Sequence, residues 1–324
     1  MGPQKTTNAS GPPRWAWTHK SLLIWGVVLV VVAIFPLVSK NDYYQHILTV
    51  IAIYAIMSLG LNLITGFTGI LTFAQAAFAG VGGYATALLL MKTGTPYALT
   101  LPIAFLAAGA AGLVLGLSTV RAGGLYFSVI TIGFNEIFRL IATNWGSVTG
   151  GATGLVGVPL PTFLGWPLDT PRQFFYFSLL IAAVTYLILL LVVNSRFGQA
   201  IKAIRDDPIA AGSSGINVRL YSISSFVLGT AFAGLAGNLI AVFMTTISPT
   251  NFNTDASMLV VVMNVVGGLG SLPGAVFGTA LLTVATEALR NIYRFRLLLI
   301  GVLMIVMPIW RRGGILGHKL ERRI

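Results

Sequence analysis

Residues 174–193 read FFYFSLLIAAVTYLILLLVV, an apolar stretch without a charged side chain. An α-helix of about 20 residues spans the roughly 30 Å hydrocarbon core of a bilayer. The stretch therefore predicts a transmembrane helix. The sequence on both sides contains further stretches of the same kind, which sets the fold class of the whole chain.

The composition supports a membrane protein. Charged residues make up 9% of the 324 residues and hydrophobic residues 56%, with a mean hydropathy of +0.87. Soluble domains carry about 25% charged residues. These values exclude an ordinary soluble enzyme, a disordered chain and a disulfide scaffold. The absence of cysteine excludes thiol chemistry, and three well-separated histidines do not suggest a metal site.

We expect an all-α, polytopic transmembrane helix bundle of about ten spans with interrupted helices. The transmembrane domain covers residues 21–311, between an N-terminal tail (1–20) and a basic C-terminal tail (312–324). Besides 174–193, charge-free intervals place spans at 22–38, twice within 43–91, at 93–120 and 220–254, twice within 256–286, and at 297–310. A further span is the apolar stretch 125–142, which is broken only by Glu136 and Arg139.

The charge imbalance predicts the orientation. The chain has 20 Lys and Arg against 8 Asp and Glu, a net charge of +12. Because the basic residues lie between apolar runs, the positive-inside rule explains them better than nucleic-acid binding does. We expect a multi-pass membrane protein with both termini cytoplasmic. Loop 194–219 would then be cytoplasmic and loop 144–172 external.

The basic loop at 194–219 predicts two short helices. Ile201 and Ile204 share one side of the first helix at helical spacing. Asp207 suits the N-cap of a second helix, Pro208 suits its first turn, and Gly215 suits its end. The loop is either a compact element with an apolar face for a partner or a solvated connector that only fixes orientation.

This loop resembles the coupling loop of bacterial ABC importer permeases, whose pattern is Glu-Ala-Ala-x-x-x-Gly. Ile209-Ala210-Ala211 with Gly215 has this spacing, although Ile209 replaces the glutamate. Four further motifs, beginning at Gly60, Arg121, Thr149 and Gly267, resemble the LivM-type permease family of branched-chain amino acid importers. The resemblance implies that an ATPase contacts Arg196, Gly198, Arg205, Asp206, Asp207, Ala210, Ala211 and Gly215.

The resemblance also implies a bacterial inner membrane and three kinds of partner: a second permease of LivH type, two cytoplasmic ATPases and an external solute-binding protein. We expect no enzyme activity and no cofactor on this chain. It contains no Gly-Lys dipeptide and hence no P-loop, so ATP and Mg would bind to the ATPase subunits. The solute would be a branched-chain or related amino acid. A permease for urea or another small polar solute, and an ion-coupled secondary transporter, are the alternatives.

Polar residues and glycines within apolar stretches are candidates for the translocation path. Glu136 and Arg139 share a helix face, and they form either a gate or a structural ion pair. Interrupted helices at 65–69 and 267–274 either expose helix ends to a substrate or allow close packing. The candidates are Asn62, Gly66, Gly69, Gln75, Tyr84, Thr131, Glu136, Arg139 and Asn264.

The expected external loop is longer than an ordinary connection. Its glycine cluster, Gly150, Gly151 and Gly154, is a candidate dock for the binding protein. The loop could instead be a lid that only covers the bundle.

Overall fold

The computed structural model describes residues 41–119, 124–163, 165–288, 301–302 and 314–315. The expected first span and N-terminal tail lie outside these residues. So do almost all of the expected last span and C-terminal tail.

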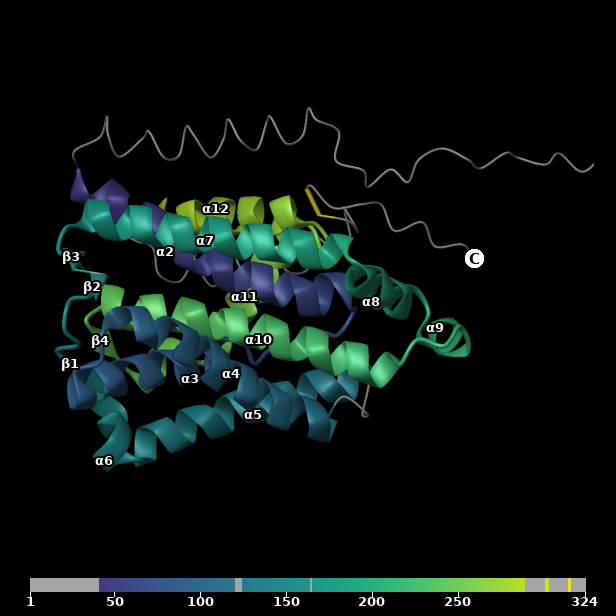
Figure 1. Cartoon of the computed structure of the whole chain (residues 1–324), viewed down its shortest axis with the longest axis horizontal. Helices are drawn as coiled ribbons and strands as arrows, with labels where there is room; N and C mark the ends of the chain where they lie inside the picture. Colours follow the sequence, from purple (N-terminus) through teal and green to yellow (C-terminus); the bar gives the residue numbers. More distant parts are fainter. Residues whose placement is uncertain (1–40, 120–123, 164, 289–300, 303–313, 316–324) are drawn as a thin grey trace, which may run out of the picture. The chain divides into compact units, whose positions relative to one another are not determined.

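The described part is a helical bundle (Figure 1). Its long helices are α2 (Asp42–Leu61), continued by the π-helical turn η1 (Asn62–Phe67), then α4 (Tyr97–Thr119), α5 (Gly124–Asn144), α7 (Pro171–Asn194) and α10 (Val218–Phe243). Shorter helices are α3 (Gln75–Leu88), continued by the π-helical turn η2 (Leu89–Thr93), α11 (Thr254–Gly267) and α12 (Leu272–Ala288).

Five of these helical elements are long and apolar enough to cross a membrane, or six when the bent pair α11–α12 is counted as one span. The predicted all-α membrane bundle is therefore confirmed among the described residues. The predicted number of about ten spans is not reached there. Two of the expected spans fall largely outside the described residues, and α3, α11 and α12 are each shorter than a standard span.

The two longest connections lie at opposite ends of the bundle (Figure 1). One end carries α8 (Arg196–Asp206) and α9 (Pro208–Ser213). The other carries α6 (Gly146–Thr149), the 3-10 turns η4 (Gly151–Thr153) and η5 (Pro249–Phe252), and strands β1 (Leu155–Val156), β2 (Thr162–Phe163), β3 (Trp166–Pro167) and β4 (Thr246–Ile247). β1 pairs antiparallel with β4, and β2 with β3.

Helix α10 packs against α2, α3 and α4 and forms the centre of the bundle. Glycines allow these helices to approach closely. A Cβ at Gly60 or at Gly229 would overlap the carbonyl of the other, and a Cβ at Gly82 would overlap the backbone of Gly234. Close backbone contact is how helices in a bilayer gain packing energy, because lipid tails are as apolar as the side chains.

The predicted interruptions are present. The pair α11–α12 bends by 119° at residues 268–271, where Gly268 and Gly270 have φ of 131° and 79°. Such φ values favour glycine because it has no Cβ. Gly274 and Gly278 then pack against Gly267, so the glycine repeat in this segment joins the two arms of the bend.

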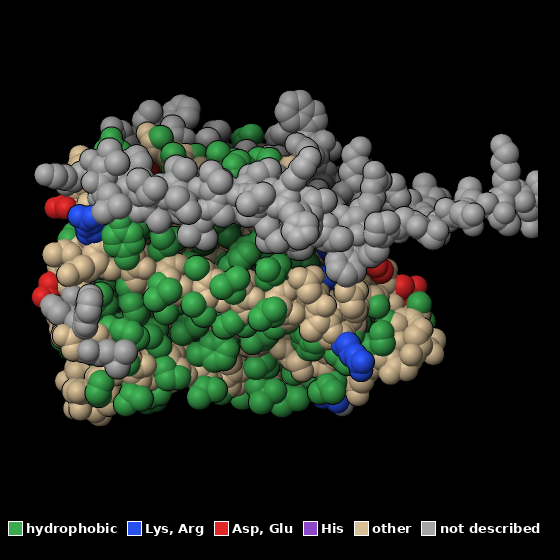
Figure 2. Space-filling model, turned by 45° about the horizontal axis from the view of Figure 1, so that its top comes forward, with side chains coloured by type: hydrophobic (Ala, Val, Ile, Leu, Met, Phe, Trp, Pro, Cys, Tyr) green, Lys and Arg blue, Asp and Glu red, His purple; other side chains and the backbone are tan. Residues whose placement is uncertain are grey.

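The face seen in Figure 2 fits a bilayer. Hydrophobic side chains cover its middle, and the charged side chains that are visible gather at its two ends. Charge at the ends and apolar surface between them is the pattern expected for helices surrounded by lipid.

Candidate functional site

The helix pair α8–α9 forms as its sequence predicts. The Ser195 hydroxyl accepts a hydrogen bond from the Gly198 N–H (3.4 Å) at the start of α8. Asp207 caps α9 by accepting hydrogen bonds from the N–H groups of Ile209 (2.8 Å) and Ala210 (3.0 Å). Gly215 follows α9 with a φ of 85°. Local capping therefore fixes the two helices and the turn between them.

The apolar side of α8 faces the bundle, which corrects the expectation that it is free for a partner. Ile201 and Ile204 are buried in the described part of the chain. On α9 the large apolar side chain of Ile209 is instead exposed, with 81% of its surface accessible. Of the other coupling-loop candidates, Arg196, Asp206, Asp207, Ala210 and Gly215 are exposed, Arg205 is partly buried, and Gly198 and Ala211 are buried.

Arg205 connects α8 to the bundle interior. Its guanidinium donates a hydrogen bond to the carbonyl of Gly66 in η1 and lies against Gly270 in the α11–α12 bend. Gly69 lies against the aliphatic stem of Arg205. Burial lowers the pKa of Arg205, while the nearby charge of Asp206 acts in the opposite direction. One cation on α8 thus touches both places where the helices are interrupted.

Asn62 holds these two interruptions together. Its side-chain oxygen accepts a hydrogen bond from the Gly270 N–H (2.8 Å), and its amide donates to the Ser271 carbonyl (3.0 Å) and the Gly268 carbonyl (3.4 Å). A Cβ at Gly66 would overlap this amide. We call the group of Asn62, Gly66, Arg205 and Gly270 the Arg205 junction.

Lys202 makes a second contact between α8 and the bundle. Its ammonium donates a hydrogen bond to the Val193 carbonyl (3.0 Å) and lies 5.8 Å from the ring centre of Phe67. Burial lowers the pKa of Lys202. Two neighbouring turns of α8 are therefore fastened to the membrane helices by basic side chains.

Three other candidate path residues lie inside the bundle and bond to its backbone. Gln75 donates to the carbonyls of Met57 and Gly229, both at 3.2 Å. Asn264 donates to the Ser58 carbonyl (3.1 Å) and to the Ser58 hydroxyl (2.9 Å). Thr131 accepts from the Phe73 N–H (3.1 Å). These bonds tie separate helices together and favour the packing interpretation.

Two further candidate path residues, Tyr84 and Gly69, lie beside an unpaired polar group or an open cavity. The buried hydroxyl of Tyr84 has no hydrogen-bond partner among the described residues, and its ring packs near Phe138 and Phe252. Gly69 borders a cavity of about 280 Å³. This cavity is lined by Gly69, Ile70, Leu71, Gly124, Leu125, Phe127 and Ser128.

The start of α3 is closed by protein side chains. The Ala76 N–H donates to the Ser257 hydroxyl (2.9 Å), and the Ala77 N–H donates to the Asn135 side-chain oxygen (3.0 Å). These bonds occupy groups that a free helix N-terminus would offer to an anion. Asn135 was not predicted as a site residue; its only signal in the sequence is an amide in the middle of an apolar helix.

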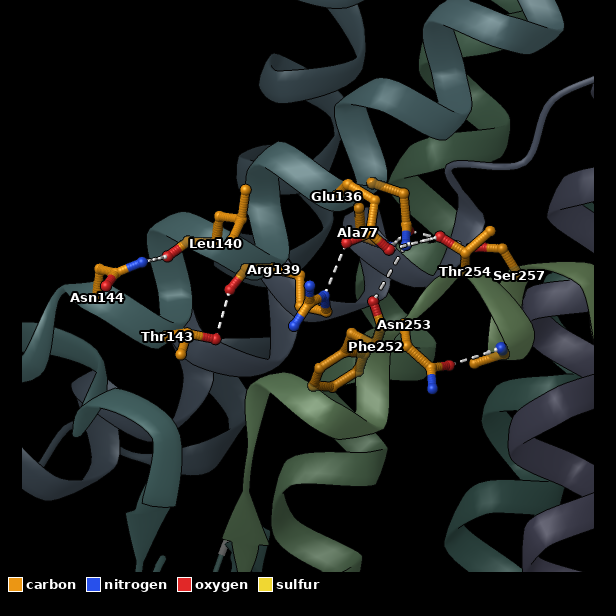
Figure 3. A network of polar contacts seen from close by, with 12 residues as sticks. Ala77, Glu136, Arg139, Leu140, Thr143, Asn144, Phe252, Asn253, Thr254 and Ser257 are labelled. Carbon is orange, nitrogen blue, oxygen red and sulfur yellow. Dashed lines mark hydrogen bonds and ion pairs between the residues drawn. The ribbon is translucent and has the colours of Figure 1, made fainter.

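Glu136 and Arg139 form the predicted ion pair on α5, with 2.8 Å between the Arg139 Nε and a Glu136 oxygen (Figure 3). The second Glu136 oxygen accepts a hydrogen bond from the Thr254 hydroxyl (2.9 Å) at the start of α11. The side chains of Glu136 and Arg139 are 40% and 36% exposed. The pair therefore ties α5 to α11 but remains open on its outer side.

The candidate docking glycines support the loop rather than form its outer surface. Gly150, Gly151 and Gly154 all have positive φ, and a Cβ at Gly154 would overlap the Ile247 carbonyl. Gly151 and Gly154 are buried, whereas Val156 is 67% exposed. Within the described residues no group of three His, Asp or Glu is placed to hold a metal ion.

Comparison with known proteins gives a consistent match. Residues 43–308 match the family model described as the permease component of branched-chain amino acid transport systems. The chain is 34% identical to the high-affinity branched-chain amino acid transport permease LivM of Escherichia coli, with 92% of this chain and 76% of the relative covered. It is 28% identical to LivH of Salmonella typhimurium, over 84% of this chain and 93% of the relative.

A third relative is the probable LivM permease of Methanocaldococcus jannaschii, which is 25% identical over 86% of this chain and 94% of its own length. No solved structure matches the chain.

The Arg205 junction leads to a first prediction. Asn62→Ala removes the acceptor of the Gly270 N–H and two donors to the same turn. Leaving buried backbone groups unpaired costs roughly 1–3 kcal/mol, so we expect the free energy of unfolding of the purified chain to fall by that amount. The thermal midpoint in detergent measures it.

The matched control is Asn144→Ala. Asn144 is exposed and donates to the Leu140 carbonyl of its own helix. A surface change of this kind alters stability by at most about 0.5 kcal/mol. Equal losses in the two variants would contradict the role given to Asn62.

Proposed function

This chain belongs to the permease family of branched-chain amino acid ABC transport systems, and we propose that it carries these amino acids inward by alternating access. It is a multi-pass membrane protein and a transport component rather than an enzyme. We assign the import step to a complex in which this chain forms part of the membrane pathway and ATPase subunits supply the work.

The orientation follows from charge and helix direction. Arg196, Lys202, Arg205 and Arg219 lie at the end of the bundle that carries α8 and α9, which we place in the cytoplasm. At the opposite end, the Tyr43 hydroxyl donates to Glu287 (3.0 Å), joining the start of α2 to the end of α12. One crossing before α2 would therefore place the N-terminus in the cytoplasm.

We also propose the larger number of spans. Eight helical segments lie between residues 42 and 288 when α3 and each arm of the α11–α12 bend are counted with the five longer elements. Apolar runs at 22–38 and 297–310 would bring the total to about ten. An even number of crossings places both termini on the side of α8, together with the basic C-terminal sequence.

The position of α8–α9 is the main support for the proposal that ATPase subunits drive import. The pair projects from the bundle with Ile209 exposed, while Arg205 of the same element bonds to Gly66 inside the bundle. An ATPase that moves α9 would therefore displace the junction of η1 and the α11–α12 bend. ATP binding shifts the transporter between its two states only if the ATPases contact those states differently, and this element offers such a contact.

We propose three kinds of partner. Two ATPases bind the α8–α9 end and hold ATP and Mg, since this chain has no P-loop. A second permease of LivH type completes the pathway. Both LivM and LivH of Escherichia coli are named as permeases of one high-affinity branched-chain amino acid system, and both are similar to this chain.

The third partner is an external solute-binding protein. We place its dock at the end opposite α8–α9, around the exposed apolar residues Val156 and Leu160. In this arrangement Gly150, Gly151 and Gly154 shape the loop that presents them. Specificity among small amino acids would then depend largely on the binding protein.

Arg205→Ala should uncouple the complex. Hydrogen bonds to charged groups contribute roughly 1.5–3 kcal/mol, and 1.4 kcal/mol corresponds to a tenfold change in an equilibrium. We therefore expect stimulation of the ATPase by loaded binding protein to fall about tenfold, with basal ATP hydrolysis retained. Arg219→Ala, an exposed arginine at the start of α10 that is not among the coupling-loop candidates, is the control. Full stimulation in Arg205→Ala would refute coupling through the junction.

Ile209→Asp should release the ATPase subunits. A charge at an apolar contact is costly, and this side chain is 81% exposed and so is not needed for the fold of the chain itself. Copurification of ATPase with the tagged permease measures the effect. Ile209→Met keeps the apolar contact and should retain the ATPase. Undiminished copurification with Ile209→Asp would exclude α9 as the dock.

Val156→Asp should weaken the response to the binding protein. We expect a higher concentration of binding protein to be needed for half-maximal ATPase stimulation, while ATPase subunits remain bound. Val156→Thr preserves the side-chain shape and serves as the control. An unchanged concentration dependence would place the dock elsewhere.

A further inference from the structure

Two long elements of the bundle end in the same sequence pattern. Helix α2 with η1 covers 26 residues (Asp42–Phe67), and α10 also covers 26 residues (Val218–Phe243). Both close with Asn-Leu-Ile-x-x-Phe, which begins at Asn62 in the first and at Asn238 in the second. A helix of 14 residues follows each, α3 after η1 and α11 after α10, and α4 or α12 comes next. The chain therefore repeats one plan of three helices.

The two repeats run in opposite directions. Element α2–η1 ends beside α8, where Arg205 bonds to Gly66, whereas α10 begins after α9 and ends before β4 at the other end of the bundle (Figure 1). Inverted repeats of this kind recur in transporters, and alternating access is then largely a movement of one packed unit against another. The packing of the helices shows which units these are.

Each long helix packs with the two following helices of the other repeat. Helix α10 packs against α3 and α4, and α2 packs against α11 and α12. We call α10, α3 and α4 the α10 body, and α2, η1, α11 and α12 the α2 body. The α10 body is closely packed, because a Cβ at Gly234 would overlap the Ala104 carbonyl on α4 and a Cβ at Gly237 would overlap the Ala79 carbonyl on α3. Each body thus contains helices from both repeats.

The repeated asparagines brace the two bodies from within. Asn62 on η1 bonds to the turn between α11 and α12 in the α2 body. Asn238 on α10 donates to the hydroxyls of Thr86 on α3 (2.7 Å) and Thr100 on α4 (2.9 Å). Its oxygen accepts from the Tyr97 hydroxyl on α4 (2.8 Å). All of these side chains are buried, and fully bonded buried networks make the groups that they join rigid. Each body is therefore held as one unit.

The contact between the two bodies is of a different kind. Helices α2 and α10 meet at Gly60 and Gly229, where no side chains interlock. Gln75 at the start of α3 donates to the Met57 carbonyl of the α2 body and to the Gly229 carbonyl of the α10 body. Its side-chain oxygen is buried and has no hydrogen-bond partner among the described residues. This interface resists relative movement less than the braces inside each body do.

The helix pair α8–α9 spans both bodies. Arg205 on α8 bonds to Gly66 of the α2 body. The ring centres of Phe197 on α8 and Tyr221 on α10 are 5.5 Å apart, and α9 leads directly into α10. A force applied to α8–α9 therefore acts where the two bodies are joined.

We propose that transport proceeds by movement of the α10 body against the α2 body, with the path for the amino acid along the interface between them. This inference rests on the proposed function, because it takes from it alternating access driven at α8–α9. The contact of Gly60 with Gly229 serves as the pivot. Rotation about it opens the interface at one end of the bundle and closes it at the other, while Asn62 and Asn238 keep each body intact.

Disulfide cross-links test the movement directly, because the chain contains no cysteine. The pair Ala76→Cys and Ser257→Cys joins the start of α3 to α11 and hence the two bodies. The Ala76 nitrogen and the Ser257 hydroxyl are 2.9 Å apart. We expect amino acid uptake by the whole complex to fall in proportion to the cross-linked fraction and to return when the disulfide is reduced.

The matched control joins two helices of one body. In the pair Gly109→Cys and Ala231→Cys, which links α4 to α10, the Cβ atoms would lie 3.3 Å apart, close to the spacing in a disulfide. Its oxidation should leave uptake unchanged. Uptake that persists with the Ala76–Ser257 cross-link, or that is lost equally with the control cross-link, would overturn the proposal. Uptake by the reduced proteins tests the proposed function separately, so the two failures are distinguishable.

Discussion

The hydrogen bond from the Arg205 guanidinium to the Gly66 carbonyl joins two places where the membrane helices are interrupted. An unpaired backbone group inside a bilayer costs several kcal/mol, so an interruption persists only where protein groups replace the lost helical bonds. Asn62 supplies such groups to the turn at 268–271. The glycines let the chains approach closely enough for one arginine to reach both segments. The bend, the π-helical turn and the placement of α8 therefore depend on one small group of contacts.

This arrangement makes α8 an integral part of the helix bundle. The buried sides of Ile201 and Ile204, together with Lys202 and Arg205, fix α8 to the bundle, so α8 cannot move alone. Helix α9 makes a different contribution because Ile209 points away from the chain. Within a few residues the chain thus changes from an exposed apolar side chain on α9 to buried contacts of α8 with the interrupted helices. π-Helical turns such as η1 recur at functional sites, where a helix must change its geometry.

The sequence alone predicted the structural features that depend on residues close together along the chain. Asp207, Pro208 and Gly215 act within one helical turn, so their roles are local, and the glycine-rich break at 267–274 is equally local. The interior contacts were not predictable in the same way. Asn135 and Ser257 cap the start of α3 from helices far away in the sequence, and no spacing rule connects them to Ala76 or Ala77. Which side of α8 is buried also depends on tertiary packing. The sequence shows only that α8 has an apolar face, not whether this bundle or a partner covers it.

Polar side chains inside the bundle differ in their hydrogen bonds and in their accessibility. The buried amides Asn62, Gln75, Asn135 and Asn264 all bond to backbone groups of other segments, so they hold the bundle together. The side-chain oxygens of Gln75 and Asn264 are also buried but have no hydrogen-bond partner among the described residues. Lining a path instead requires polar atoms that remain open on one side. The ion pair of Glu136 and Arg139 on α5 differs from these amides, because more than a third of each side chain is accessible. Its inner side is tied to the start of α11 through Thr254. The far end of α11 leads into the bend that Arg205 contacts, so α5 and α8 meet opposite ends of the same helix.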